Sequence, residues 1–145
     1  MESKKLAVAS SRCFVRTSSR DTTAQKMVMK KLTPVGFTSI QPKSLPPEIQ
    51  LIPLGGHTIG HTGVAVHDGD RWLLHCGDAY YYHQELENTP HPHPLLDIVQ
   101  TRSEVHHDLR LGTQARLREL VRNHGDEVSV FSAHDPWEFE RYRAA

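Results

Sequence analysis

The stretch IPLGGHTIGHTGVAV, residues 52–66, places two histidines four residues apart in a glycine-rich segment between two apolar runs. The pair Gly55-Gly56 predicts that the chain bends directly after the first run. The two imidazoles are either metal ligands or polar residues of a turn. Which of the two applies depends on the chemistry that the remaining sequence supplies.

The segments around this stretch predict a mixed α/β layer with helices covering a sheet. An Asp68-Gly69 step between two apolar-rich runs is a strong hairpin signal, and prolines in TPHPHPLL (89–96) argue against helix and central strand. The expected elements are strands at 35–40, 49–54, 62–67, 71–76 and 127–133, a loop at 83–96, a helical region from about residue 95 that is clearest over 111–125, and a short helix over 134–143.

The two predicted helices carry specific boundary signals. Leu117, Leu120, Val121 and His124 recur at helical spacing on one face, and Gly125 follows where a C-cap belongs. In HDPWEFERYR the residues Asp135, Pro136 and Glu138 fit an N-cap, a first helical residue and the distal member of a capping box.

Length and composition predict one ordinary soluble domain preceded by a basic tail. The chain has 145 residues, 37% of them hydrophobic, and no formal net charge. Residues 1–31 carry eight Lys or Arg against two acidic residues, so we assign 1–32 to a disordered tail and 33–145 to the domain. The domain itself is acidic, which argues against nucleic-acid binding, and no apolar run is long enough for a membrane span.

Two cysteines form neither a disulfide framework nor a CxxC site, so a reducing, cytoplasmic location is the default. The basic tail also fits an organellar transit peptide, which stays open as an alternative.

Three polar residues each follow the end of a predicted strand. His57 follows the strand at 49–54, Asp78 follows the strand at 71–76, and His134 follows the last strand. Side chains at strand ends can converge while the sheet stays intact. Two imidazoles and a carboxylate suit zinc, and also iron or manganese. Their joint pattern makes a metal site as good an interpretation as separate structural or surface histidines.

The segments GGHTIGHTGVAV (55–66), LLHCGDAYYY (73–82) and FSAHDPWEFERY (131–142) resemble three successive motifs of the metallo-β-lactamase-fold hydrolase superfamily. The resemblance runs from about residue 35 to residue 143 and implies the second half of an αβ/βα sandwich. It implies that His57 binds one metal, Asp78 bridges two metals and His134 binds the second.

The resemblance also suggests roles for residues beside these three. His61 matches the second histidine of the GHT motif, which implies a hydrogen-bonding position behind the ligands. Some members of the superfamily use a tyrosine near the bridging aspartate to donate to the substrate carbonyl, so Tyr81 is a catalytic candidate beside Asp78. A packing role is the competing interpretation of Tyr81 and the favoured one for Tyr82.

The HxHxDH motif that normally precedes the GHT motif has no counterpart, because no histidine precedes His57. HPHPLLD (91–97) and VHHD (105–108) follow Asp78, and we expect their histidines to face solvent. One histidine per metal and a shared carboxylate remain, so we expect weak metal binding and impaired hydrolysis, as in a truncated or rearranged enzyme. We also expect the inner sheet face to be left uncovered, which favours a homodimer or a complementary half as partner.

Two functions therefore stay open. The first is a metal-dependent hydrolase, acting by metal-bound hydroxide on a small-molecule ester, thioester, lactone or amide, with impaired activity. The second is a non-catalytic remnant or partner-binding module that keeps the fold without the site.

Overall fold

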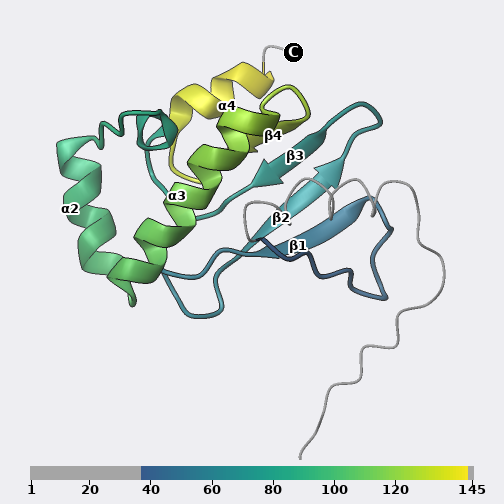
Figure 1. Ribbon diagram of the computed structural model, residues 1–145, viewed down its shortest axis with the longest axis horizontal. Helices are drawn as coiled ribbons and strands as arrows, with labels where there is room; N and C mark the ends of the chain where they lie inside the picture. The colour runs from purple at the N-terminus through teal and green to yellow at the C-terminus, as the bar shows by residue number, and fades with distance from the viewer. Residues whose placement is uncertain (1–36, 144–145) are drawn as a thin grey trace, which may run out of the picture.

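The computed structural model describes residues 37–143, which form a four-stranded mixed sheet with helices packed beside it (Figure 1). The strands are β1 (Ile49–Pro53), β2 (Thr62–His67), β3 (Trp72–His75) and β4 (Val128–Phe131), and they lie in the order β1-β2-β3-β4. The pairs β1–β2 and β2–β3 are antiparallel, whereas β3–β4 is parallel. Because β2 alone runs in the reverse direction, the carboxyl ends of β1, β3 and β4 meet at one edge of the sheet.

The predicted hairpin is present as β2 and β3. Its turn is closed by Asp68, whose Oδ1 accepts hydrogen bonds from the backbone N–H groups of Asp70 and Arg71. Gly69 has a φ of +114°, a conformation that glycine adopts without steric cost. The turn sets a register in which Val66 lies opposite Leu73, so both residues project from the same sheet face.

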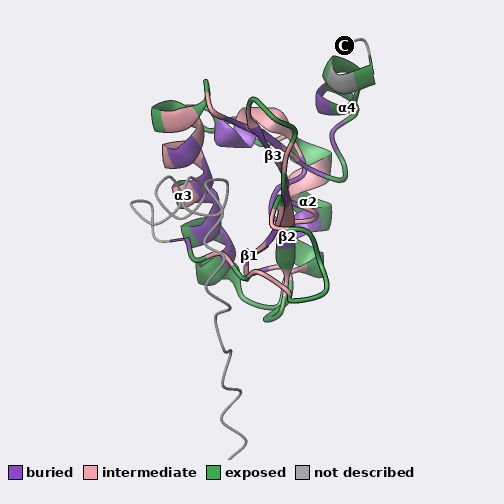
Figure 2. Cartoon of the chain, turned by 90° about the vertical axis from the view of Figure 1, so that its right-hand side faces the viewer, coloured by how far each residue is buried: buried purple, intermediate pink, exposed green. Residues whose placement is uncertain are grey.

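One face of the sheet forms the hydrophobic core under helix α3 (His107–His124). Leu117 and Leu120 of α3 are fully buried, as the helical spacing predicted. Each fully buried large apolar side chain contributes about 1.5–3 kcal/mol to folding. Figure 2 shows α3 on one side of the strands. The strand residues in this core are Ile52, Ala65, Trp72, Leu74, Val128 and Val130.

The opposite sheet face is apolar but less buried. Leu51, Val64, His75 and Phe131 are paired in one row across all four strands, and each is only half-buried. Val66, in the neighbouring row, is 36% exposed. We call this surface the open face and define it by the row from Leu51 to Phe131 together with Val66 and Leu73. The described residues 37–143 cover it only in part.

The helical elements differ from the sequence prediction in two places. The predicted loop at 83–96 contains the 3-10 helix η2 (His83–Leu86), and helix α2 (Pro94–Ser103) starts at its last proline. Pro94 is tolerated there because the first turn of a helix does not use that residue's N–H. The predicted strand at 35–40 is wrong within the described residues, where only Ile40 forms an isolated bridge, with Leu51.

The last helix, α4 (Pro136–Arg143), begins as predicted at Pro136. Asp135 accepts hydrogen bonds from the N–H groups of Trp137 and Glu138, which is N-cap geometry. The capping box is not completed, because the Glu138 carboxylate bonds elsewhere.

The assignment of residues 1–32 to a tail lies outside the described residues. Within 37–143, no helix has the length and apolar character to cross a membrane.

Candidate metal centre

The carboxylate of Asp78 lies between the imidazoles of His57 and His134. Asp78 Oδ2 is 3.6 Å from His57 Nε2, and Asp78 Oδ1 is 2.8 Å from His134 Nε2. The three residues lie in the loops that follow β1, β3 and β4. Since these strands end at the same sheet edge, the topology brings the three loops together. The structure thus gathers the three residues that the sequence singled out as metal ligands.

The imidazole of His61 positions Asp78 through a hydrogen bond to its backbone. Its Nδ1 is 2.9 Å from the carbonyl oxygen of Leu54, and its Nε2 is 3.0 Å from the backbone nitrogen of Asp78. A carbonyl can only accept and a backbone N–H can only donate, so His61 is the neutral tautomer that carries its proton on Nδ1. Both nitrogens are used, which leaves His61 no lone pair for a metal.

Gly77 allows this close packing. Its φ is +54°, and a Cβ at this position would lie 2.7 Å from His61 Nε2. Any other residue would therefore meet both a backbone penalty and a collision with the imidazole. The carbonyl of Gly77 also accepts a 3.0 Å hydrogen bond from the N–H of Ala133, next to His134.

The junction between α2 and α3 holds the loop of His57. The N–H of Val105 donates to the carbonyls of Gly56 and His57, and the N–H of His106 also donates to that of Gly56. A Cβ at Gly56 would lie 2.4 Å from the Cα of Arg110, so the loop packs directly on the start of α3.

A buried ion pair between Glu104 and Arg110 braces this junction. Burial alone would raise the pKa of Glu104, but hydrogen bonds from Arg110 and His107 outweigh it and hold that pKa below its ordinary value. Glu104 is therefore ionised at neutral pH, when it pairs with the guanidinium.

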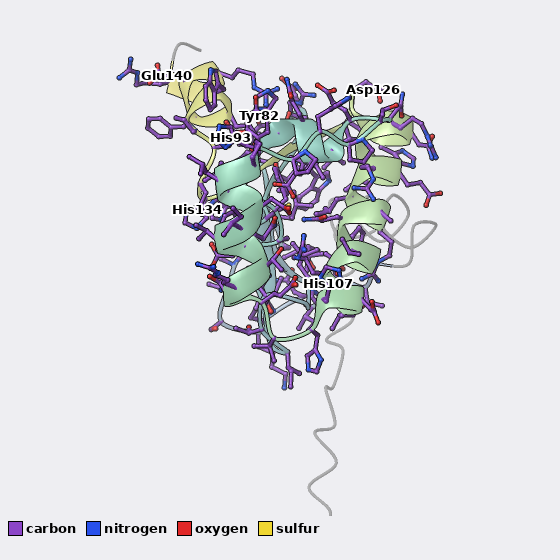
Figure 3. The ribbon with its side chains drawn as sticks, turned by 90° about the vertical axis from the view of Figure 1, so that its left-hand side faces the viewer. Tyr82, His93, His107, Asp126, His134 and Glu140 are labelled. Atoms are coloured by element: carbon purple, nitrogen blue, oxygen red, sulfur yellow. The ribbon has the colours of Figure 1, made fainter. Side chains whose placement is uncertain are left out.

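The other histidine-rich motifs stay away from Asp78. His93, at the start of α2, packs against Tyr82 with ring centroids 5.7 Å apart, near α4 (Figure 3). His107 lies at the start of α3, away from both His93 and His134 (Figure 3). Its Nδ1 is 2.6 Å from Glu104 Oε1. His91 and His106 are exposed.

Tyr81 packs against His134, with ring centroids 4.3 Å apart. Tyr81 as a whole is 5% exposed. Burial, together with the negative charge of Asp78, raises the pKa of Tyr81 above its ordinary value. The phenol therefore keeps its proton at neutral pH and can donate a hydrogen bond.

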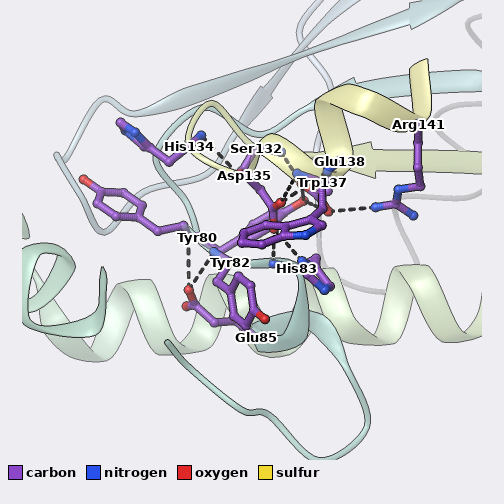
Figure 4. Close-up of polar contacts among 11 residues, drawn as sticks. Tyr80, Tyr82, His83, Glu85, Ser132, His134, Asp135, Trp137, Glu138 and Arg141 are labelled. Carbon is purple, nitrogen blue, oxygen red and sulfur yellow. Dashed lines mark hydrogen bonds and ion pairs between the residues drawn. The ribbon is translucent and has the colours of Figure 1, made fainter. Parts of the chain in front are cut away.

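Two buried carboxylates fix the loops beside the candidate ligands, and no sequence pattern predicts their burial. Glu85 Oε1 accepts from the N–H groups of Tyr81 and Tyr82. Glu138 accepts from the hydroxyl of Tyr80 and the N–H of Ser132 (Figure 4). Glu85 lies in a segment without periodic pattern, and Glu138 has the sequence signature of a helix cap, so neither carried a signal of burial.

The donor chemistry around Asp78 suits a divalent transition metal, but the donor set is small. Imidazole nitrogens and carboxylate oxygens are the ligands that zinc, iron and manganese accept. His57 Nδ1 is buried without a hydrogen-bond partner in the described part of the chain, so this imidazole lacks the outer acceptor that metal-binding histidines usually have. Within 37–143 no group of three or more His, Cys, Asp or Glu is disposed to hold a single ion. Each imidazole instead faces its own oxygen of Asp78.

Comparisons with known proteins find relatives among metallo-hydrolases. Proteins from Mycobacterium bovis and Mycobacterium tuberculosis, each named probable metallo-hydrolase, are 36% identical over 102 residues, or 70% of this chain and 33% of theirs. The chain thus spans about a third of the length of these curated relatives. No protein-family model matches it.

Solved structures share the fold. An N-acyl homoserine lactone hydrolase, with its product N-hexanoyl-L-homoserine at the catalytic metal centre, matches with a TM-score of 0.50 and 20% identity. The match covers 74% of this chain and 36% of that one. An AiiA variant from B. thuringiensis with N-decanoyl-L-homoserine at its active site matches equally well.

These findings confirm the resemblance stated from the sequence. Over about 70% of its length, the chain has a partial metallo-β-lactamase-like α/β fold, and its curated relatives are named as metallo-hydrolases.

Proposed function

We propose that this chain supplies part of a two-metal hydrolase centre. His57 would hold one ion and His134 the other, and Asp78 would contribute to both. The observation that carries the proposal is the pair of contacts made by Asp78, one carboxylate oxygen toward each imidazole. A carboxylate shared in this way is suited to bridge two cations. The curated relatives, named as probable metallo-hydrolases, support a metal-dependent hydrolase.

Zinc fits the nitrogen and oxygen donors, as do iron and manganese. When bound, such a metal polarises a carbonyl and activates water, which is the chemistry needed to hydrolyse an ester, thioester, lactone or amide. The chain's own residues orient the site. His61 fixes the backbone of Asp78. The protonated hydroxyl of Tyr81, which has a hydrogen bond with Ser103, would have to turn from that partner to donate to a substrate carbonyl.

The described residues offer each ion one imidazole and one carboxylate oxygen. Catalytic zinc sites usually use three protein ligands per ion and leave one position open for water. We therefore propose weak metal binding and slow hydrolysis by this polypeptide alone, with further ligands supplied by a partner. The open face between Leu51 and Phe131 is the surface on which a complementary half or a second copy would pack.

The test is zinc affinity, measured by competition with a chromophoric chelator, together with hydrolysis of a panel of lactone, ester, thioester and amide substrates. His57→Ala, Asp78→Asn and His134→Ala should each weaken zinc binding at least about tenfold. His91→Ala is the matched control, because this side chain is 63% exposed and pairs with Glu87. Equal zinc affinity in all four variants and the wild type would rule out the proposal.

A partner-binding module without catalysis is the second candidate, and the open sheet face favours it. Val66 is 36% exposed beside the half-buried row from Leu51 to Phe131. In this case sedimentation should show an assembly that Val66→Lys disrupts, while His57→Ala changes no activity. Turnover of a carbonyl substrate that is lost in His57→Ala would eliminate this candidate.

A further inference from the structure

One buried carboxylate connects the two loops that carry Asp78 and His134. Glu138 lies in the first turn of α4 and is 2% exposed. Its Oε2 accepts a 2.8 Å hydrogen bond from the N–H of Ser132, and the hydroxyl of Tyr80 lies 2.9 Å from both carboxylate oxygens (Figure 4). Tyr80 is fully buried, so this bond is shielded from water.

The two hydrogen-bond partners of Glu138 lie at the same sequence distance from the candidate ligands. Tyr80 is two residues after Asp78, and Ser132 is two residues before His134. The Glu138 carboxylate therefore links the loop after β3 to the loop after β4. The same two loops carry Asp78 and His134, whose Oδ1 and Nε2 atoms are 2.8 Å apart.

The alternative is that Glu138 only stabilises the fold, for example by capping helix α4. The hydrogen bonds at the start of α4 argue against a capping role. Asp135 already accepts the N–H groups of Trp137 and Glu138, so the helix has its cap without the Glu138 side chain. Burial raises the pKa of Glu138 above its ordinary value, which means that desolvating this carboxylate opposes folding. The guanidinium of Arg141, its ion-pair partner among residues 37–143, is 3.4 Å away with a side chain 62% exposed, so it compensates little of that cost.

We propose that Glu138 is a positioning residue for the metal centre: its bonds to Tyr80 and Ser132 set the spacing of Asp78 and His134 and so tune how tightly the pair binds a metal ion. This inference rests on the proposed function, because it concerns the same two ligands. Glu138 touches neither ligand and acts through the loops alone.

The experiment titrates the purified protein with Co²⁺, recording affinity and the visible absorption of the bound ion, which reports its coordination. Glu138→Gln and Tyr80→Phe should each weaken Co²⁺ binding about tenfold, the size typical of outer-shell changes, and should shift the absorption band. Because Tyr80 and Glu138 share one hydrogen bond, the double variant should lose less than the product of the two single effects. Arg141→Gln, which removes only the exposed ion pair, should bind Co²⁺ like the wild type.

Urea unfolding without metal is measured on the same variants. If Glu138→Gln lowers stability while Co²⁺ affinity and spectrum stay at wild-type values, the role is structural and the inference is overturned. If Glu138→Gln does not fold, Tyr80→Phe carries the same test, since phenylalanine preserves the packing. A wild type that binds no Co²⁺ refutes the proposed function and this inference together. Wild-type binding that all variants share refutes the inference alone.

Discussion

Replacing Gly77 by alanine should destabilise the protein and disturb Asp78 at once. A residue with a Cβ at φ +54° costs about 1–3 kcal/mol. The added Cβ would lie 2.7 Å from His61 Nε2, so the imidazole must move. That movement weakens its bonds to Leu54 and Asp78, each with a net contribution of about 0.5–1.5 kcal/mol. The sum is about 2–6 kcal/mol, a large part of the about 5–15 kcal/mol that stabilises a typical domain.

Urea unfolding measures this loss, and two other glycines divide it into its causes. Gly69→Ala places a side chain on a backbone with a φ of +114°, but no atom lies within 4 Å of the added Cβ. Gly60→Ala adds a Cβ without backbone strain and without a neighbour within 4 Å. We expect the loss of unfolding free energy to rise from Gly60→Ala to Gly69→Ala to Gly77→Ala. Zinc affinity should fall in Gly77→Ala only. A Gly77→Ala variant as stable as Gly60→Ala would refute the reasoning about His61.

Three further outcomes follow from the buried groups. His61→Ala leaves the Asp78 N–H and the Leu54 carbonyl without their partner, so unfolding free energy should fall by about 1–3 kcal/mol in urea titrations. Burial raises the pKa of Glu85, so the stability that its protonated form contributes is present at acidic pH and is lost as pH rises through the folded-state pKa. Urea midpoints should therefore fall with rising pH in this range, and Glu85→Gln should reduce that fall. Cys76 is fully buried, and burial raises its pKa; in a Cys13→Ser background it should react with a thiol reagent only after unfolding.

Much of the fold could be predicted because its signals are local. The Asp68-Gly69 turn specified the hairpin, and the spacing of Leu117 and Leu120 identified the buried face of α3. The convergence of His57, Asp78 and His134 could be anticipated from one rule, that each follows a strand. The parallel directions of β1, β3 and β4 are what bring these strand ends together.

Other features could not be predicted because they depend on tertiary contacts. Pro94 stands in a proline-rich segment that looks like a loop, yet it starts α2. Glu138 matches a capping box, but its side chain is drawn to Tyr80 and Ser132, which are distant in sequence or outside the helix. Nothing in the spacing of charged residues distinguishes such a buried carboxylate from an exposed one, because its partners come from other elements.

X-ray absorption at the zinc edge tests the gathered centre most directly. Zinc-loaded protein should show nitrogen and oxygen ligands at about 2.0–2.2 Å with outer-shell scattering from imidazole. His57→Ala and His134→Ala should each reduce that imidazole scattering, while His91→Ala should leave it unchanged. An imidazole signal that persists unaltered in both His57→Ala and His134→Ala would show that zinc binds elsewhere and would contradict the site described around Asp78.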